Sequence, residues 1–326
     1  MAAGWIGGTL LALATATVVA FVVSPWPSVL LIGMAFAGND AASENALERH
    51  VPPSLTVHND LAYGDGPDEL LDLVLPADVP GQLPVVLWVH GGGFIGGSKD
   101  GVANYLKILA AQGFAVAGMN YSTAPGATYP TPVRQVAAAL KFLADEGQAL
   151  NVDADRIVLA GDSAGAQIAA QAALIATDPN YAAKVGIKPT IGAEQLKGTI
   201  LVSGAFDMRS IDMEGGGVAG WFVKTVLWSY SGVRDFMNDE QFLLASITPN
   251  VSSRFPPTFL TSGDADPLEP QARALYRKLH DLGVDVEALF FDAGPELQHE
   301  YQFNLDTVEG QQAFRRSAGF IKRVTD

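Results

Sequence analysis

The stretch that decides the fold is Gly161-Asp162-Ser163-Ala164-Gly165. It directly follows the apolar run Ile157 to Ala160 and precedes an alanine-rich helical pattern that extends to Ala176. A strand that turns sharply into a helix presents the serine hydroxyl at the end of a sheet, and the two glycines are needed because larger side chains would collide in so tight a turn. The helix N-terminus also favours developing negative charge. This pattern predicts that Ser163 is a nucleophile on a strand–turn–helix unit.

Outward from this stretch, the chain alternates between strand and helix patterns. Short, continuous apolar runs predict strands that are buried on both faces of a mainly parallel sheet. Helical periods lie between them, one opened by Pro130 and Pro132 and another from Pro270 to Leu282 that ends on Gly283. The alternation predicts an α/β fold with a mainly parallel, doubly wound sheet and helices on both faces. The predicted strands are 70–75, 85–89, 114–119, 156–160, 198–202, 257–261 and 286–291.

A second glycine-rich stretch, His90-Gly91-Gly92-Gly93-Phe94, follows the strand predicted at 85–89. Adjacent glycines leave backbone N–H groups unshielded, and acyl transfer requires such donors around the tetrahedral oxyanion. We assign this oxyanion-hole role to the N–H groups of Gly92, Gly93 and Ala164. A flexible loop is the simpler interpretation, whereas a phosphate-binding loop is excluded because no Gly-Lys-Ser/Thr sequence follows.

A serine nucleophile needs a general base, and the chain has five histidines. His50 and His58 precede the predicted sheet. His90 belongs to the glycine-rich stretch and is expected to order that loop, while His280 lies in a helical pattern typical of a solvated surface. His299 remains, in a loop after the last predicted core strand, and it is the candidate base.

The carboxylate that orients the base is expected at the end of the preceding strand, in Gly263-Asp264-Ala265-Asp266. In this type of sheet the three groups follow each other as serine, acid and histidine. Asp264 and Asp266 both qualify. Asp264 could instead hydrogen-bond the turn, which is a common role for Asp in such loops.

With the serine motif, the three glycines and His299 in place, the chain resembles the α/β-hydrolase superfamily from about residue 55 to residue 321. More narrowly, it resembles the hormone-sensitive-lipase-like esterases and their feruloyl-esterase-like and isoprenylcysteine-methylesterase-like relatives. In these families the acid stands in Gly-x-x-Asp or begins Asp-Pro-Leu, and Asp266 satisfies both forms. The resemblance implies a serine carboxylesterase with the triad Ser163, Asp266 and His299, short-chain ester substrates, and no metal or organic cofactor.

Two departures from the family pattern stand out. Family members often carry an Arg after the Tyr at 121 and an Asp near 135, where this chain has Ser122 and Gln135, so an ion pair is missing.

The alternatives to an esterase are an amidase or deacetylase with the same triad, and a catalytically silent binding protein, because a fold alone does not prove activity.

The segment 207–248 is too long for a plain connection between strands and is rich in aromatic residues. We expect it to form a small cap that walls the acyl pocket, because apolar pockets over such sites are built from inserted loops. An ordinary helix packed on the sheet is the alternative interpretation.

Residues 1–37 carry no charged side chain. As a helix, Trp5 to Val23 would span roughly 28 Å, close to the hydrocarbon thickness of a bilayer. We expect a membrane anchor, with the side of the membrane undetermined. A cleaved signal ending near Ala35-Phe36-Ala37, which would give a secreted or periplasmic protein, and a soluble packing element are the alternatives. Residues 38–56 are expected to be a linker, and 57–326 the catalytic domain.

The composition limits the partners. The formal net charge is −15, which excludes a nucleic-acid-binding surface, and the absence of cysteine excludes thiolate nucleophiles and disulfides. The expected partners are a small-molecule ester and, through the N-terminus, the lipid bilayer. The sequence does not indicate an oligomeric state.

Overall fold

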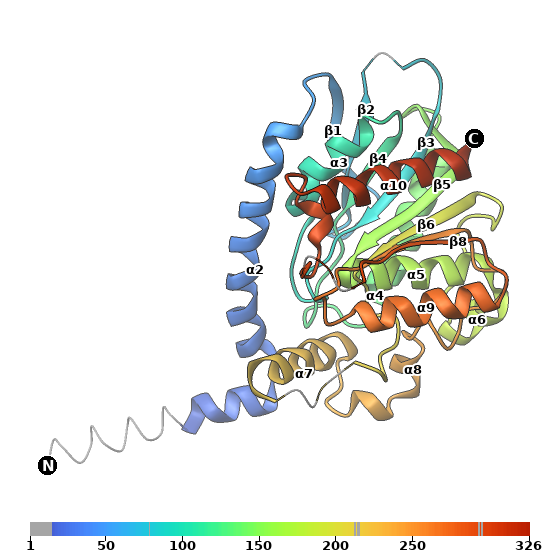
Figure 1. Cartoon of the computed structure of the whole chain (residues 1–326). Helices are drawn as coiled ribbons and strands as arrows, with labels where there is room; N and C mark the ends of the chain where they lie inside the picture. Colours follow the sequence, from blue (N-terminus) through green and yellow to red (C-terminus); the bar gives the residue numbers. More distant parts are fainter. Residues whose placement is uncertain (1–14, 78, 212, 214–215, 293, 295) are drawn as a thin grey trace, which may run out of the picture.

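The computed structural model describes residues 15–326 except 78, 212, 214–215, 293 and 295. Its sheet has eight strands in the order β1-β2-β4-β3-β5-β6-β7-β8 (Figure 1). Strand β2 pairs antiparallel with β1 and β4, and the other neighbouring pairs are parallel. The predicted mainly parallel sheet is therefore confirmed. The strands are β1 (Leu55–Ala62), β2 (Leu70–Pro76), β3 (Leu83–Val89), β4 (Ala115–Met119), β5 (Val152–Asp162), β6 (Leu196–Val202), β7 (Thr258–Thr261) and β8 (Val286–Leu289).

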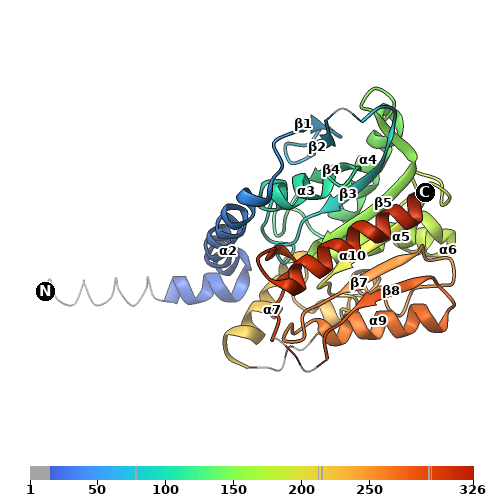
Figure 2. The same cartoon turned by 45° about the horizontal axis from the view of Figure 1, so that its top comes forward.

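Helices cover both faces of the sheet, as the turned view shows (Figure 2). One face is covered by α3 (Ala103–Ala110) and α10 (Val308–Thr325). The other face is covered by α4 (Thr131–Glu146), α5 (Ser163–Thr177), α6 (Pro179–Val185) and α9 (Glu269–Asp281). Alternate residues of β3 point to the two faces: Val85, Leu87 and Val89 join one core, whereas Val86 and Trp88 join the other. A strand buried on both faces explains why this run is continuously apolar. Short 3₁₀ helices lie at Glu48–His50, Lys99–Val102, Phe236–Asn238 and Tyr301–Phe303.

The predicted cap segment, 207–248, is largely helical. It contains α7 (Gly217–Ser231) and α8 (Glu240–Leu243) between β6 and β7. Tyr230 of α7 stacks on Phe94 of the glycine-rich stretch with ring centroids 3.9 Å apart and an interplanar angle of 6°. The carbonyl of Tyr230 also accepts the N–H of Tyr129 at 2.7 Å. The segment thus packs directly against the loop that carries the three glycines.

The linker predicted at 38–56 is wrong for residues 38–47, which continue helix α2 (Trp26–Leu47). This helix runs along one side of the sheet and meets α7 at its lower end (Figure 1). Tertiary contacts override the polar composition that suggested a linker: the Glu44 carboxylate accepts the N–H of Asn104 at the start of α3 at 2.9 Å, and Leu47 is buried. At the other end of α2, Val29 and Ile32 are buried too.

A shorter helix, Thr15–Val23, precedes α2 and is bent by 90° against its first part, Trp26–Met34. Within the described residues no single helix is long and apolar enough to cross a membrane, although this bent pair is by length and composition. Residues 5–14 of the expected anchor lie outside the described residues. Arg234 Nη1 donates to the carbonyl of Val22 at 2.8 Å and so ties this helix to the segment after α7.

Candidate active site

Ser163 stands at the junction of β5 and α5 with φ of +50°, a conformation that costs free energy for any residue except glycine. The neighbouring glycines make this turn possible. A Cβ atom at Gly161 would lie 2.7 Å from the carbonyl oxygen of Val89, and one at Gly165 would lie 2.0 Å from the same atom. Both predicted steric requirements for glycine are therefore present, and the turn lifts the serine hydroxyl above the carboxyl ends of the strands.

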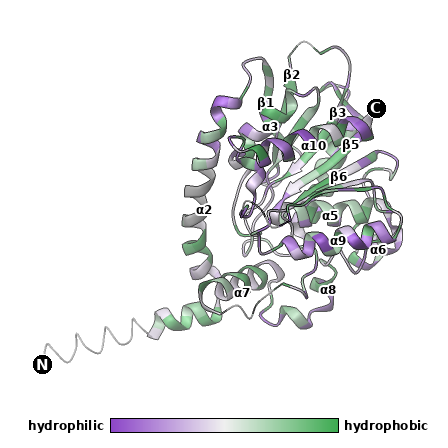
Figure 3. Ribbon diagram, in the orientation of Figure 1, coloured by the Kyte–Doolittle hydropathy of each residue, from purple (hydrophilic) through white to green (hydrophobic). Residues whose placement is uncertain are grey.

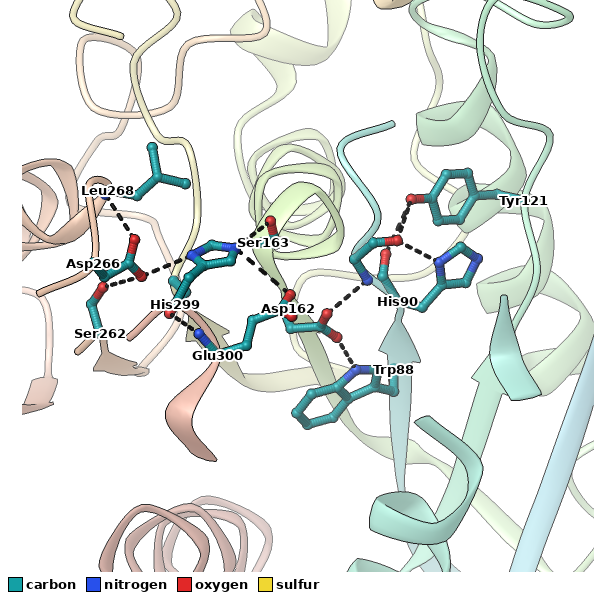
Figure 4. Close-up of polar contacts among 12 residues, drawn as sticks. Trp88, His90, Tyr121, Asp162, Ser163, Ser262, Asp266, Leu268, His299 and Glu300 are labelled. Carbon is teal, nitrogen blue, oxygen red and sulfur yellow. Dashed lines mark hydrogen bonds and ion pairs between the residues drawn. The ribbon is translucent and has the colours of Figure 1, made fainter. Parts of the chain in front are cut away.

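The structure brings together Ser163, at the start of α5, and Asp266 and His299, from the loops after β7 and β8 (Figure 4). Ser163 Oγ lies 2.9 Å from His299 Nε2, and His299 Nδ1 lies 3.0 Å from Asp266 Oδ2. The Asp266 carboxylate is buried and also accepts hydrogen bonds from the hydroxyl of Ser262 and the N–H of Leu268, each at 2.9 Å. These contacts have the geometry that proton transfer from a serine hydroxyl to an imidazole requires, with a carboxylate positioned to orient the ring.

The pKa values of Asp266 and His299 are both shifted in the direction that this arrangement requires. Burial acts to raise the pKa of Asp266, but the hydrogen bonds from His299 and Leu268 outweigh it and lower the pKa. Burial acts to lower the pKa of His299, but the hydrogen bond to Asp266 and the negative charge of Glu300 outweigh it and raise that pKa above its usual value. Asp266 therefore stays ionised at neutral pH, and His299 is a stronger base than a free imidazole.

Asp264, the competing carboxylate, has a different environment. Its oxygens accept the N–H groups of Leu297 at 2.6 Å and Gly294 at 3.1 Å, and these hydrogen bonds lower its pKa. It thus fastens the loop that precedes His299, which is the turn-bonding role considered for it above. Asp266 is the carboxylate that faces the imidazole.

The glycine-rich stretch lies beside Ser163. Gly92 and Gly93 have φ of +110° and +59°, and the carbonyl of Gly92 accepts the N–H groups of Ile95 and Gly96. His90 is buried, its Nδ1 lies 2.7 Å from the carbonyl of Gly91, and its ring stacks on Tyr121 at 4.3 Å. Burial lowers the pKa of His90 to about 4, so this ring is neutral and orders the loop, as expected.

Comparison with known proteins agrees with this geometry. The sequence profile of the alpha/beta hydrolase fold family matches residues 86–302. The chain belongs to the α/β-hydrolase family. Its resemblance to known members places it in the hormone-sensitive-lipase-like carboxylesterase branch.

Several similar relatives and solved structures are esterases by name. An esterase of Gibberella moniliformis is 29% identical over 274 residues, which cover 77% of this hydrolase and 80% of the relative. Esterase LipQ of Mycobacterium tuberculosis is 31% identical over 69% of this hydrolase, but the match spans only 53% of LipQ. A bacterial heroin esterase has a TM-score of 0.73 with 24% identity, covering 89% of this chain and 90% of that one. An esterase B from Lactobacillus rhamnosis reaches 0.77 with 23% identity, covering 91% and 96%. At these identities the two structures establish the fold.

The missing family ion pair is replaced by neutral hydrogen bonds in this hydrolase. Gln135 Oε1 accepts the N–H of Ser122 at 2.8 Å, and Gln135 Nε2 donates to the Ser122 hydroxyl at 2.9 Å. The two positions therefore still connect the loop after β4 with the start of α4. The connection no longer requires two buried charges, whose desolvation is costly.

Sequence reasoning missed a pair of carboxyl groups beside His299, those of Asp162 and Glu300 (Figure 4). Asp162, directly before Ser163, is buried and accepts hydrogen bonds from Trp88 Nε1 at 2.6 Å and the N–H of Gly91 at 2.8 Å. Burial, and after it the neighbouring Glu300, raise the pKa of Asp162 well above its usual value. Glu300 Oε1 lies 3.8 Å from His299 Nε2. The adjacency of Glu300 to the candidate base in the sequence was the available signal.

Two cavities lie on this side of the molecule. The larger, about 610 Å³, is lined by α7 and the N-terminal helices, including Phe21, Trp221 and Trp228, and the residues that line it include no member of the triad. The smaller, about 270 Å³, is lined by His299, Glu300 and Gly92. Of the two, only the smaller is lined by one of the three predicted catalytic residues, His299; Ser163 and Asp266 are not among the residues that line it. Within the described residues, no group of three or more His, Asp or Glu side chains is arranged to hold a metal ion.

Proposed function

We propose that this hydrolase cleaves short-chain carboxylic esters with Ser163 as the nucleophile, His299 as the general base and acid, and Asp266 as the group that orients His299. The observation that carries the proposal is the continuous contact from Ser163 Oγ through His299 to the buried Asp266 carboxylate, at 2.9 and 3.0 Å. The names of the curated relatives support an ester as substrate.

In the first half-reaction, Ser163 Oγ attacks the ester carbonyl carbon while its proton passes to His299 Nε2. The N–H groups of Gly92, Gly93 and Ala164 would stabilise the resulting oxyanion. The tetrahedral intermediate collapses, the alcohol leaves with the proton from Nε2, and an acyl-enzyme remains. In the second half-reaction, water loses a proton to Nε2 and attacks the acyl carbon. The acid product leaves, and Ser163 regains its proton.

An amidase or deacetylase would use the same residues, so the assay has to compare leaving groups. We expect p-nitrophenyl butyrate to be hydrolysed with a kcat/KM at least about 10³-fold above that of the matched butyryl p-nitroanilide, because the amide bond is intrinsically less reactive and its departing nitrogen needs stronger protonation. Comparable values for both would indicate an amidase. Turnover of neither would indicate a silent binding protein.

We expect a preference for acyl chains of about two to six carbons, with each buried CH₂ contributing at most ~0.8 kcal/mol until the pocket ends. The cap segment supports this expectation, because Tyr230 of α7 packs on Phe94 next to the glycine-rich loop and leaves a small cap rather than a large lid. A series of p-nitrophenyl esters from acetate to palmitate measures the optimum. A maximum at twelve carbons or beyond would contradict the expected pocket.

The pH dependence follows from His299, which must be neutral to act as a base. Because its pKa is raised, kcat/KM is expected to fall as the pH drops through a value above the usual 6.5 of histidine. Glu300→Gln removes one of the charges that raise this pKa, so the acid limb of the profile is expected to move to lower pH. A profile from pH 5 to 9 with a neutral ester checks both statements. An acid limb that moves to higher pH in the variant would contradict them.

The N-terminus is proposed to hold the hydrolase at a membrane. Large apolar side chains are exposed along the bent helix pair and on α7, where Val218 is 79% exposed, and both regions are coloured as hydrophobic in Figure 3. Exposed apolar surface that is continuous over neighbouring helices is typical of insertion into the interfacial region of a bilayer. The exposed side chains on the helix pair are Val18, Val19, Val22, Val23, Trp26, Leu30, Leu31 and Met34.

We expect full-length protein to sediment with membranes and to be released by detergent but not by high salt, because the contact is apolar. A variant that begins at residue 25 lacks the exposed Val18, Val19, Val22 and Val23, so it should sediment less than the full-length protein while it keeps its kcat on p-nitrophenyl butyrate. A variant that begins at residue 40 should lose activity, because it removes the buried Val29 and Ile32 of α2. If expression of the full-length chain instead yields soluble protein whose N-terminus is Gly38, the N-terminal segment is a cleaved signal and not an anchor.

A further inference from the structure

The cavity of about 270 Å³ is lined by His299, the residue that protonates the departing alcohol in the proposed mechanism. In the proposed mechanism the leaving oxygen takes its proton from His299 Nε2, so it must come within hydrogen-bond distance of that nitrogen. His299 lines this cavity together with Gly92 of the glycine-rich loop and Ser43 of helix α2. The atoms attached to the leaving oxygen therefore meet the groups that surround Nε2 in this cavity.

Among the residues that line the cavity, Glu300 is the charged group nearest to His299 Nε2, where the leaving oxygen must come. Its Oε1 lies 3.8 Å from Nε2, and its side chain is 29% exposed, so it is open to a bound molecule. Glu300 has φ of +59°, which a glycine would adopt at lower free-energy cost, so the local backbone does not require a glutamate. The carboxylate is placed on the path of the leaving group.

The negative charge in the cavity is not neutralised by its surroundings. Burial and the neighbouring Glu300 raise the pKa of Asp162, and its carboxylate accepts hydrogen bonds from Trp88 Nε1 and the N–H of Gly91, whereas the Glu300 carboxylate is partly exposed to the cavity. The described residues that line the cavity include no Lys or Arg, and His90 in its wall is neutral because burial lowers its pKa to about 4. The ring of Phe303 completes the wall with an aromatic group, which also attracts cations.

We propose that Glu300 makes this hydrolase selective for esters whose alcohol carries a positive charge close to the ester oxygen, such as amino-alcohol or quaternary-ammonium esters. The inference rests on the proposed ester hydrolysis and names the substrate class for it. The net charge of −15 would additionally raise the local concentration of such cations.

The test compares butyrylcholine with 3,3-dimethylbutyl butyrate, in which an uncharged carbon replaces the ammonium nitrogen at nearly the same shape. For the wild type we expect kcat/KM to favour the choline ester by about tenfold, mainly through a lower KM, because the charge acts on binding. Glu300→Gln should reduce this ratio to about twofold or less, whereas Glu300→Asp, which keeps the charge, should retain most of it.

Asp281→Asn serves as the matched control. It removes the same formal charge from an exposed position at the end of α9, outside the residues that line the cavity, and should leave the ratio unchanged. Because the ratio compares two esters on one variant, it is insensitive to a general loss of activity. Titration with a fluorophosphonate gives the fraction of active sites in each preparation.

The outcomes separate this inference from the proposed function. A wild-type ratio near one, with p-nitrophenyl butyrate still hydrolysed, would overturn the cation selectivity and leave the esterase intact. A high ratio that persists in Glu300→Gln would overturn the assignment to Glu300. A wild type that hydrolyses none of the three esters would refute the proposed function itself, and the selectivity with it.

Discussion

Ser163→Ala is expected to lower kcat on p-nitrophenyl butyrate by on the order of 10⁴-fold or more, and His299→Ala by a similar factor. The two side chains act as one unit, because the serine is a weak nucleophile until Nε2, 2.9 Å away, accepts its proton. The double variant should therefore be no slower than the slower single variant. Steady-state kinetics on purified proteins, with circular dichroism to establish folding, provide the measurement.

A matched control is available in the other exposed histidine. His280 lies at the end of α9 with its side chain 70% exposed, and its replacement by alanine should change kcat by less than about twofold. If either Ser163→Ala or His299→Ala kept activity within tenfold of the wild type, the triad assignment would be wrong.

The second large effect is expected at Asp266. Asp266→Asn should lower kcat by about 10³- to 10⁴-fold, because an amide at this position no longer stabilises the imidazolium and can hold the wrong tautomer of His299. The carboxylate is buried and lies 3.0 Å from Nδ1, so a water molecule cannot enter between the two groups to replace the lost interaction without moving the ring. The measurement is again kcat on p-nitrophenyl butyrate.

Asp264→Asn provides the comparison within the same loop. Its carboxylate bonds the N–H groups of Leu297 and Gly294 and does not face the imidazole, so the substitution should cost less than about tenfold in kcat. The reverse ranking of the two variants would show that Asp264 is the orienting acid.

The parts of the fold and site with strong local signals could be predicted from the sequence. The apolar run before Ser163 and the two glycines around it form a continuous pattern in the sequence. The turn, the sheet and the position of Ser163 could therefore be inferred directly, and the structure shows that neither glycine has room for a Cβ atom. His299 followed by elimination among five histidines, and Asp266 was preferred to Asp264 only because the family pattern favoured it. The structure adds the contacts themselves, which depend on loops distant in sequence.

The prediction failed where tertiary contacts decide the conformation. Residues 38–47 have a polar composition, yet they are helical because α2 packs along the domain and Glu44 binds the start of α3. The carboxyl pair of Asp162 and Glu300 was missed, although each residue is adjacent in the sequence to a candidate catalytic residue. The two residues are far apart in the sequence, and the raised pKa of Asp162 arises only once Asp162 is buried and Glu300 lies beside it.

The central claim is that Ser163 is the nucleophile, and covalent labelling tests it most directly. Wild-type protein incubated with a fluorophosphonate is expected to gain one adduct per chain, with loss of activity proportional to labelling, because only an activated serine reacts rapidly. Mass spectrometry of the digested protein should place the adduct on Ser163, and Ser163→Ala should gain none. An adduct on another residue, or full inactivation of the wild type without modification of Ser163, would contradict the assignment.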